Sequence, residues 1–335
     1  MKAAVFKKKW FMAVEEVPTP VPREDEALVK IKYCGICGTD LHNYSFGITA
    51  PGRVLGHEWC GMITELGKGV QNFSKGDRVM LYKHKRRSSP RLRLNPRAGY
   101  SSPSRRMGAY AEYLAVPTSR IIRIPDEVSD KQAATLEPLV AAIHAVRLGK
   151  IKISDTVAFI GAGPIALLMI QRVRQAGARA VYVSEPAKIR AAKAAELGAN
   201  QVFNPFKEDV IAEIVKLTGG KGPDIVYECA ATKNTLNQAC QLVARNGRVT
   251  CLAVYQEPIT LTPLDWYTMQ PEIKFTTNGD STPFDWEIGL EVMIKNQIDV
   301  ETTISTIISL HEIQETFQTL LDPSKNTMLR VLVEP

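Results

Sequence analysis

The feature that most constrains the fold is a regular alternation of two kinds of apolar segment over residues 151–278. Short runs rich in valine and isoleucine alternate with longer segments in which apolar residues recur at helical spacing. Strands that alternate with helices of this length are typical of βαβ units, which build a parallel sheet. The strand-like runs are TVAFI, AVYV, QVF, DIVYECA, RVTCLAV and EIKFTTN. The sequence therefore predicts an α/β fold with a doubly wound, six-stranded parallel sheet.

The residues before this region show a different pattern. From residue 2 to about residue 82, apolar runs such as AAVF, ALVKIKY and RVMLY are broken by glycine and proline, which predicts an antiparallel, β-rich domain. After about residue 278, two segments with helical spacing and the closing strand MLRVLVEP add no further βαβ unit. We therefore expect one domain formed by residues 1–140 and completed by residues 279–335, and a second formed by residues 141–278.

A glycine motif follows the first strand of the predicted parallel sheet. Gly161, Gly163 and Ala166 form GxGxxA at the start of a helix. The first glycine permits a tight turn, the second lets backbone approach a pyrophosphate, and the third position must be small. Because a helix N-terminus also attracts phosphate, Gly161, Gly163, Pro164 and Ile165 are candidate contacts of a dinucleotide. Taken alone, the motif is equally compatible with a glycine turn that binds no ligand.

An acidic residue follows the second strand. Glu185 lies about twenty residues after the motif, where a carboxylate accepts hydrogen bonds from the ribose hydroxyls of a dinucleotide. A carboxylate there repels a 2′-phosphate, so NAD is predicted rather than NADP. Lys188 and Arg190 follow closely and would weaken this preference, and Arg190 is a further candidate cofactor contact. The alternative is that Glu185 merely begins the next helix.

Potential metal ligands are concentrated in YCGICGTDLH and VLGHEWCG. Thiolate and imidazole suit zinc, and a catalytic zinc site keeps one position open for water or substrate. Cys37 and His57 are the strongest candidates, with Glu58 beside them. The alternative is a pair of buried thiols and a core histidine. The remaining cysteines are expected to be buried thiols without a role in the site: Cys34, Cys60, Cys229, Cys240 and Cys251.

Together these residues resemble the medium-chain, zinc-containing alcohol dehydrogenase family, and its polyol and diol dehydrogenase branch in particular. The resemblance covers nearly the whole chain, through CGICGTDLH, GHEWCG, GDRV, GAYAEYLAVP, LEPL and GAGPIA. It implies a GroES-like catalytic domain and a Rossmann domain that binds NAD. It also implies that Cys37 and His57 bind zinc, that Glu58 is a ligand or a near neighbour, and that Glu137 reaches zinc directly or through water.

The resemblance assigns further roles around the metal. It implies that Asp40 orients the His57 ring, that Thr39 contacts the alcohol oxygen, and that His42 passes the proton to solvent through the cofactor ribose. The chemistry has a physical basis, because hydride leaves an alcohol carbon readily only when its oxygen carries negative charge. Zinc lowers the pKa of bound water from about 15.7 to about 7, and a bound alcohol should respond similarly.

The expected reaction is reversible hydride transfer between NAD and a secondary alcohol of a polyol, sugar alcohol or vicinal diol. Activity like that of L-threonine 3-dehydrogenase is one alternative, and a catalytically inactive dinucleotide-binding protein is another. The resemblance also implies a homodimer or homotetramer formed through the sixth strand. The sequence has neither a signal-peptide core nor about 18 consecutive apolar residues, so we expect a cytoplasmic protein without a membrane partner.

One segment accounts for the net charge of +7. Residues 83–106 contain nine lysines and arginines and no acidic residue, so the rest of the chain carries a net charge of −2. Nucleic acid is therefore an unlikely partner of the fold as a whole. The interval also lacks the four cysteines that hold a structural zinc in many relatives, so one catalytic zinc is expected. The segment itself is interpreted as a solvated lobe, a frame-shift product, or an anion or nucleic-acid contact.

Overall fold

The computed structural model describes residues 1–82, 108–276, 281–322 and 324–335. The chain forms two compact units, of which the first contains Met1–Glu137 and Leu290–Pro335 and the second contains Pro138–Gly289. The domain limits expected from the sequence stay a prediction. The basic segment 83–106 lies outside the described residues. Among the described helices, none is long and apolar enough to cross a membrane.

Two sheets build the first unit, as the broken apolar runs predict. The larger has the strand order β15-β16-β3-β5-β6-β8, with β7 paired to β3, and the smaller has the order β2-β1-β4. All pairs are antiparallel except β15 with β16. The strands are β1 (Lys2–Lys8), β2 (Phe11–Glu16), β3 (Glu26–Gly35), β4 (Arg53–Val54), β5 (Glu58–Leu66), β6 (Arg78–Leu81), β7 (Tyr113–Pro117), β8 (Ile121–Arg123), β15 (Ile304–Ser309) and β16 (Arg330–Glu334).

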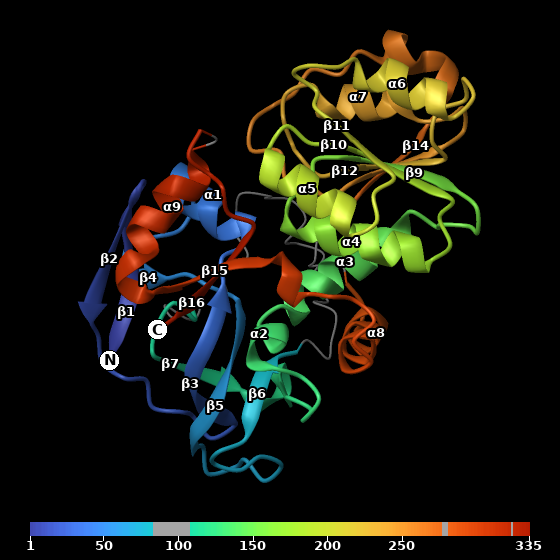
Figure 1. Ribbon diagram of the computed structural model, residues 1–335. Helices are drawn as coiled ribbons and strands as arrows, with labels where there is room; N and C mark the ends of the chain where they lie inside the picture. Colours follow the sequence, from blue (N-terminus) through green and yellow to red (C-terminus); the bar gives the residue numbers. More distant parts are fainter. Residues whose placement is uncertain (83–107, 277–280, 323) are drawn as a thin grey trace. The chain divides into compact units, whose positions relative to one another are not determined.

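The C-terminal part of the chain lies beside the N-terminal strands in this unit, where red and blue segments meet in Figure 1. Strand β16 pairs with β3, so that Leu332 is opposite Gly35. On its other side β3 pairs with β5, and there Gly35 is opposite Glu58. Three helices of the unit are α1 (Gly38–Phe46), α2 (Asp130–Ala133) and α9 (Ile313–Leu321). The end of β3 is therefore the point where three distant segments meet.

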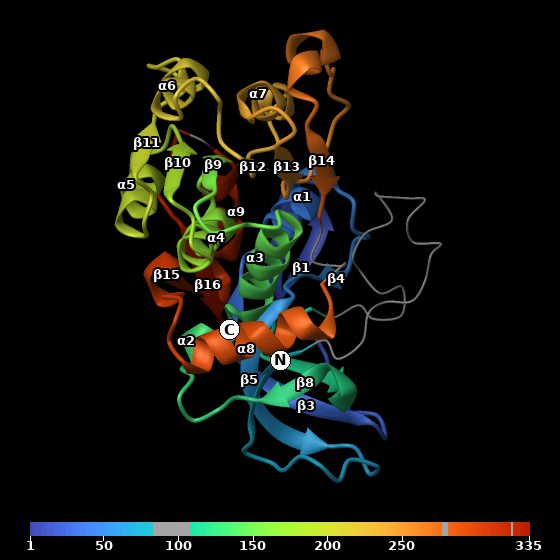
Figure 2. The same ribbon diagram turned by 90° about the vertical axis from the view of Figure 1, so that its right-hand side faces the viewer.

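The second unit contains the predicted six-stranded sheet. Its strand order is β11-β10-β9-β12-β13-β14, and every pairing is parallel. Figure 2 shows these strands side by side. They are β9 (Thr156–Ile160), β10 (Ala180–Ser184), β11 (Gln201–Phe203), β12 (Ile225–Glu228), β13 (Arg248–Cys251) and β14 (Glu272–Phe275). The order reverses between β9 and β12, and such a switch point is where open α/β sheets bind ligands.

Helices cover both faces of this sheet, which confirms the doubly wound α/β prediction. In Figure 1, α6 and α7 lie on one face and α4 and α5 on the other. The helices are α4 (Pro164–Gln175), α5 (Lys188–Glu196), α6 (Val210–Leu217) and α7 (Thr235–Leu242), with α3 (Leu136–Leu148) and α8 (Pro283–Ile294) at the limits of the unit. The strands are rich in fully buried valine and isoleucine because both faces are covered.

Candidate functional site

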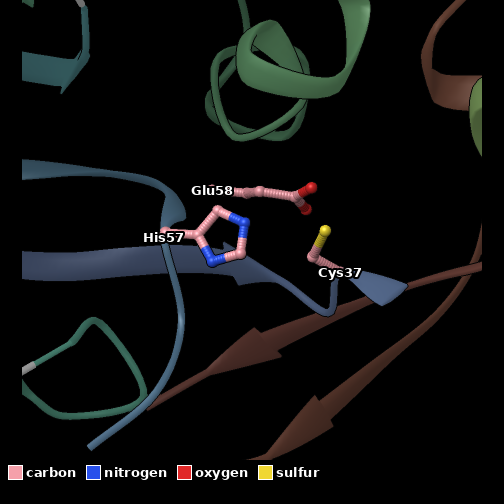
Figure 3. A group of neighbouring side chains, drawn as sticks. All are labelled: Cys37, His57 and Glu58. Atoms are coloured by element: carbon pink, nitrogen blue, oxygen red, sulfur yellow. The ribbon is translucent and has the colours of Figure 1, made fainter. Parts of the chain in front are cut away.

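Three of the four residues expected to bind metal lie together in the first unit. One ligand atom from each of Cys37, His57 and Glu58 lies within 4.8 Å of the other two, and within the described ranges this is the one such group of three or more. Figure 3 shows the Cys37 sulfur and the Glu58 carboxylate pointing toward each other beside the His57 ring. The β3–β5 register, which pairs Gly35 with Glu58, brings these segments together.

Cys37 is also the N-cap of helix α1. Its Sγ accepts a hydrogen bond from the Thr39 amide at 3.5 Å, and its own amide donates to Asp40 Oδ2 at 3.2 Å. The positive end of a helix favours a thiolate. Burial, and then the negative charge of Glu58, nevertheless raise the pKa of the Cys37 thiol. A divalent cation would offset both effects, so the donor set fits zinc.

Asp40 contacts the nitrogen of the His57 ring that faces away from the other two proposed ligands. Asp40 is 1% exposed, and its Oδ1 lies 3.4 Å from His57 Nδ1. This contact leaves Nε2 available to a metal, as expected for a carboxylate that fixes the ring of a ligand. Burial disfavours a charged imidazole, but the charges of Asp40 and Cys37, together with hydrogen bonds to them, outweigh that effect and raise the pKa of His57 well above its usual value.

A buried arginine that the sequence analysis did not identify holds Glu58. The Arg330 guanidinium donates to Glu58 Oε2, and the two residues are 3% and 1% exposed. Burial raises the pKa of Glu58, although the positive charge of Arg330 opposes that shift. The sequence feature that could have indicated a buried Arg330 is its position directly before the apolar run VLV of the closing strand.

Glu137 does not join the group of three. It is the second residue of α3, is 8% exposed, and lies close enough for its charge to raise the pKa of Glu58. Its role as a metal ligand stays a prediction.

The two residues expected to handle the proton lie on α1. Thr39 and His42 are both partly exposed. Burial lowers the pKa of His42, which keeps this imidazole neutral and able to accept a proton near neutral pH. Their contact with substrate and cofactor stays a prediction.

The glycine motif forms a tight turn between β9 and α4 in the second unit. Gly161 has φ +94°, a conformation that favours glycine, and an added Cβ would lie in tight contact with Ala230 Cβ, at 3.1 Å. Gly163 is the N-cap of α4 and Pro164 is its first residue. Ile165 follows in the first helical turn. This geometry exposes the start of a helix directly after a central strand.

Glu185 lies against this turn. Its Oε2 accepts a hydrogen bond from the Ala162 amide at 2.7 Å, and its Oε1 accepts one from the Ala187 amide at 2.9 Å. Helix α5 begins at Lys188, so Glu185 precedes the helix rather than beginning it. Arg190, on α5, is partly exposed.

The remaining cysteines are free thiols. Cys34, Cys60, Cys240 and Cys251 are buried as expected, whereas Cys229, directly after β12, is only partly buried.

Comparison with known proteins identifies both units. Residues 23–126 match the family described as the alcohol dehydrogenase GroES-like domain, and residues 164–295 match the zinc-binding dehydrogenase family. The chain is 33% identical to (R,R)-butanediol dehydrogenase of Bacillus subtilis over 82% of this chain and 83% of the relative. It is 35% identical to L-threonine 3-dehydrogenase of Pyrococcus horikoshii over 73% of each.

Solved structures agree with these matches. A zinc-binding dehydrogenase of Sinorhizobium meliloti, solved with bound NADP, superimposes with a TM-score of 0.87 at 31% identity, and the match covers 100% of this chain and 99% of that one. The sequence motifs, the two folds and these similarities agree, and the chain belongs to the medium-chain, zinc-containing alcohol dehydrogenase family.

Proposed function

We propose that this chain transfers hydride reversibly between NAD and a secondary alcohol of a polyol, sugar alcohol or vicinal diol, at a single catalytic zinc. The observation that carries the proposal is the group formed by Cys37, His57 and Glu58, with Asp40 behind the His57 ring. Thiolate, imidazole and carboxylate are all zinc ligands, and catalytic zinc sites have three protein ligands and an open position. The similarity to a butanediol dehydrogenase supports a substrate with adjacent hydroxyl groups.

In this proposal Cys37, His57 and a carboxylate of Glu58 or Glu137 hold the zinc. The zinc acts as a Lewis acid that lowers the pKa of the alcohol. Arg330 holds Glu58 by a buried ion pair at Oε2, so Glu58 would bind metal through its other oxygen or after leaving Arg330. The Thr39 hydroxyl would accept a hydrogen bond from the alcohol and give up its own proton through the cofactor ribose to His42, which is neutral near physiological pH and passes the proton to solvent.

Glu185 sets the preference for NAD in this proposal. Its buried carboxylate is fixed by two backbone amides beside the glycine turn. A charge held there attracts ribose hydroxyls and opposes a 2′-phosphate. Lys188 and Arg190 are the residues that would support NADP if the preference is weak.

Oxidation assays on a panel of substrates test the proposal. The panel contains 2,3-butanediol isomers, sorbitol, other sugar alcohols and L-threonine, each with NAD and with NADP. We expect turnover of a diol or polyol with NAD. The similarity to an L-threonine 3-dehydrogenase favours the second candidate, and turnover of L-threonine alone would select it. A protein that contains zinc but oxidises no member of the panel would contradict both.

We also propose a homodimer or homotetramer that forms through strand β14. This strand is at the edge of the sheet formed by the described strands, and Phe275 on it is 63% exposed. Nearby in sequence, Leu264 and Tyr267 are 89% and 73% exposed. Unpaired edges with exposed apolar residues favour pairing with a second chain. Light scattering should give a smaller assembly for Phe275→Lys than for the wild type; an unchanged mass would contradict this interface.

The proposed location is the cytoplasm, because a reducing compartment keeps free thiols such as these six reduced.

A further inference from the structure

The carboxylate of Asp40 has four donors around it, two on each oxygen. Oδ1 lies 3.4 Å from His57 Nδ1 and accepts a hydrogen bond from the Gly56 amide at 3.3 Å. Oδ2 accepts hydrogen bonds from the Cys37 amide at 3.2 Å and from the Tyr110 hydroxyl at 2.7 Å. Three of these donors belong to the proposed ligands or to a residue next to one. The fourth, Tyr110, comes from a separate segment and makes the shortest bond.

The position of Tyr110 is fixed on several sides. It is 0% exposed, and its backbone bonds to Leu55 on one side and to Ala4 on the other, at 3.0 Å and 2.8 Å. Its ring packs directly on Gly56, where an added Cβ would lie 2.9 Å from Tyr110 Cδ1. The Phe317 ring packs against it in a T-shaped arrangement, with the ring centroids 6.0 Å apart and the ring planes at 90°. The ring therefore cannot swing away from Asp40 without moving its neighbours.

The hydroxyl has one proton and two acceptors within reach. The Asp40 carboxylate is 2.7 Å away and the Gly35 carbonyl is 3.2 Å away. A bond to a charged oxygen at such a short distance is the stronger of the two. By contrast, the Asp40 contact with His57 is long, at 3.4 Å, and depends on where the carboxylate is held. Without the hydroxyl, Oδ2 would keep only the longer bond from Cys37.

We propose that Tyr110 is a positioning residue for the metal centre, because its hydroxyl fixes the Asp40 carboxylate in the orientation that holds the His57 ring. Tyr110 touches none of the proposed ligands through this hydroxyl and acts through Asp40. The inference rests on the proposed function, in which His57 binds zinc through Nε2.

The test removes only the hydroxyl, in Tyr110→Phe, and keeps the ring on Gly56. Zinc affinity is measured by competition with a chromophoric chelator, and the visible spectrum of the cobalt-substituted protein reports ligand geometry. We expect zinc affinity to fall about tenfold, at the low end of the 10- to 100-fold loss that follows changes to groups supporting a ligand. The cobalt spectrum should change as well.

Tyr44→Phe is the matched control. Tyr44 is also 0% exposed, its hydroxyl donates to the Trp10 carbonyl at 2.6 Å, and its ring meets Phe317 at 5.2 Å. The hydroxyl of Tyr44 bonds to no residue of the metal group. Loss of a buried hydroxyl should lower the melting temperature of this variant too, but its zinc affinity and cobalt spectrum should match those of the wild type.

A double-mutant cycle with Asp40→Asn shows whether the effect passes through Asp40. Tyr110→Phe should cause little further loss of zinc affinity once Asp40 is replaced, because coupled residues are not additive. Additive losses, or a Tyr110→Phe variant that binds zinc as tightly as the wild type, would overturn the inference. A wild-type chain that binds no zinc would instead refute the proposed function, so the two failures are distinguishable.

Discussion

The guanidinium of Arg330 forms an ion pair with the carboxylate of Glu58, and both side chains are almost fully buried. The two residues are 272 positions apart in the sequence. They meet because β16 and β5 flank the same strand, β3, at its last residue, Gly35. A buried charge pair of this kind gives the site a defined geometry at a high cost if either partner is lost.

Arg330→Met should therefore be strongly destabilising. It leaves the Glu58 carboxylate buried without its cation, and we expect the free energy of unfolding to fall by about 3–5 kcal/mol. Urea denaturation monitored by circular dichroism measures the change.

Arg123→Met is the control for Arg330→Met. Arg123 pairs with Asp77 at 2.9 Å, but its side chain is 54% exposed, so the loss should be about 0–1 kcal/mol. Equal losses in the two variants would show that burial of the Arg330 pair has no special cost.

Cys37→Ser should abolish both zinc binding and dehydrogenase activity. We expect about one zinc per wild-type chain, since the proposed site holds a single ion with one open position. Metal content by mass spectrometry and NADH formation are measured on the same preparation.

Cys60→Ser is the matched control, because Cys60 is also buried, its Sγ donates to the Asp130 carbonyl at 3.0 Å, and burial raises its pKa to about 12. Cys60 therefore remains protonated at neutral pH, and the Cys60→Ser variant should bind as much zinc as the wild type. A Cys37→Ser variant that keeps its zinc would exclude Cys37 as a ligand.

Glu185→Ser should weaken the preference for NAD. The loss of a charged acceptor for ribose hydroxyls is worth about 1.5–3 kcal/mol, which corresponds to a fall of at least about tenfold in kcat/KM with NAD. Activity with NADP should fall less or rise. The control is Glu208→Ser, since Glu208 makes an exposed bond to the Asn204 amide at 3.2 Å in the same unit. Unchanged cofactor preference would place the ribose elsewhere.

Asp285 should make the protein sensitive to acid. It is 0% exposed and accepts hydrogen bonds from Arg147 Nε at 2.8 Å and from the Thr282 amide at 2.7 Å. Burial alone would raise the pKa of Asp285, but hydrogen bonds from Thr282 and Arg147 and the charge of His144 lower it below its usual value of 3.8.

The lowered pKa of Asp285 determines how the stability of the protein depends on pH. Because the folded pKa lies below the unfolded one, the stabilising contribution is complete well above pH 3.8 and is lost as the pH falls through the folded pKa. Urea denaturation at a series of acidic pH values should show this loss in the wild type and much less of it in Asp285→Asn. Parallel pH profiles for the two proteins would contradict the assignment.

Local sequence patterns were sufficient to predict most of the fold and the central residues of the candidate site. The parallel sheet was predictable because each strand and helix has its own periodicity, and the turn at Gly161 because its positive φ favours glycine. Cys37 and His57 were predictable as a group because their residue types are uncommon together and their motifs are specific.

What the sequence did not reveal depends on long-range contact. Arg330 meets Glu58 only through the register of three strands, and no local pattern encodes that register. Tyr110 lies in an apolar motif, where an aromatic residue is expected to pack in the core. A role for its hydroxyl becomes evident only when the structure shows its hydrogen bond to Asp40. Glu137 illustrates the reverse case, because its motif suggests a ligand while its side chain lies outside the group of three.

The pairing of β16 with β3 also affects how the site is made during protein synthesis. At about 5–20 residues per second, the 272 residues that follow Glu58, up to and including Arg330, take roughly 14–54 s to translate. During that interval Cys37, His57 and Glu58 exist on the nascent chain without the arginine that later neutralises the glutamate. Zinc that arrives early would meet a carboxylate without its cation, and Arg330 would pair with Glu58 only after β16 has joined β3.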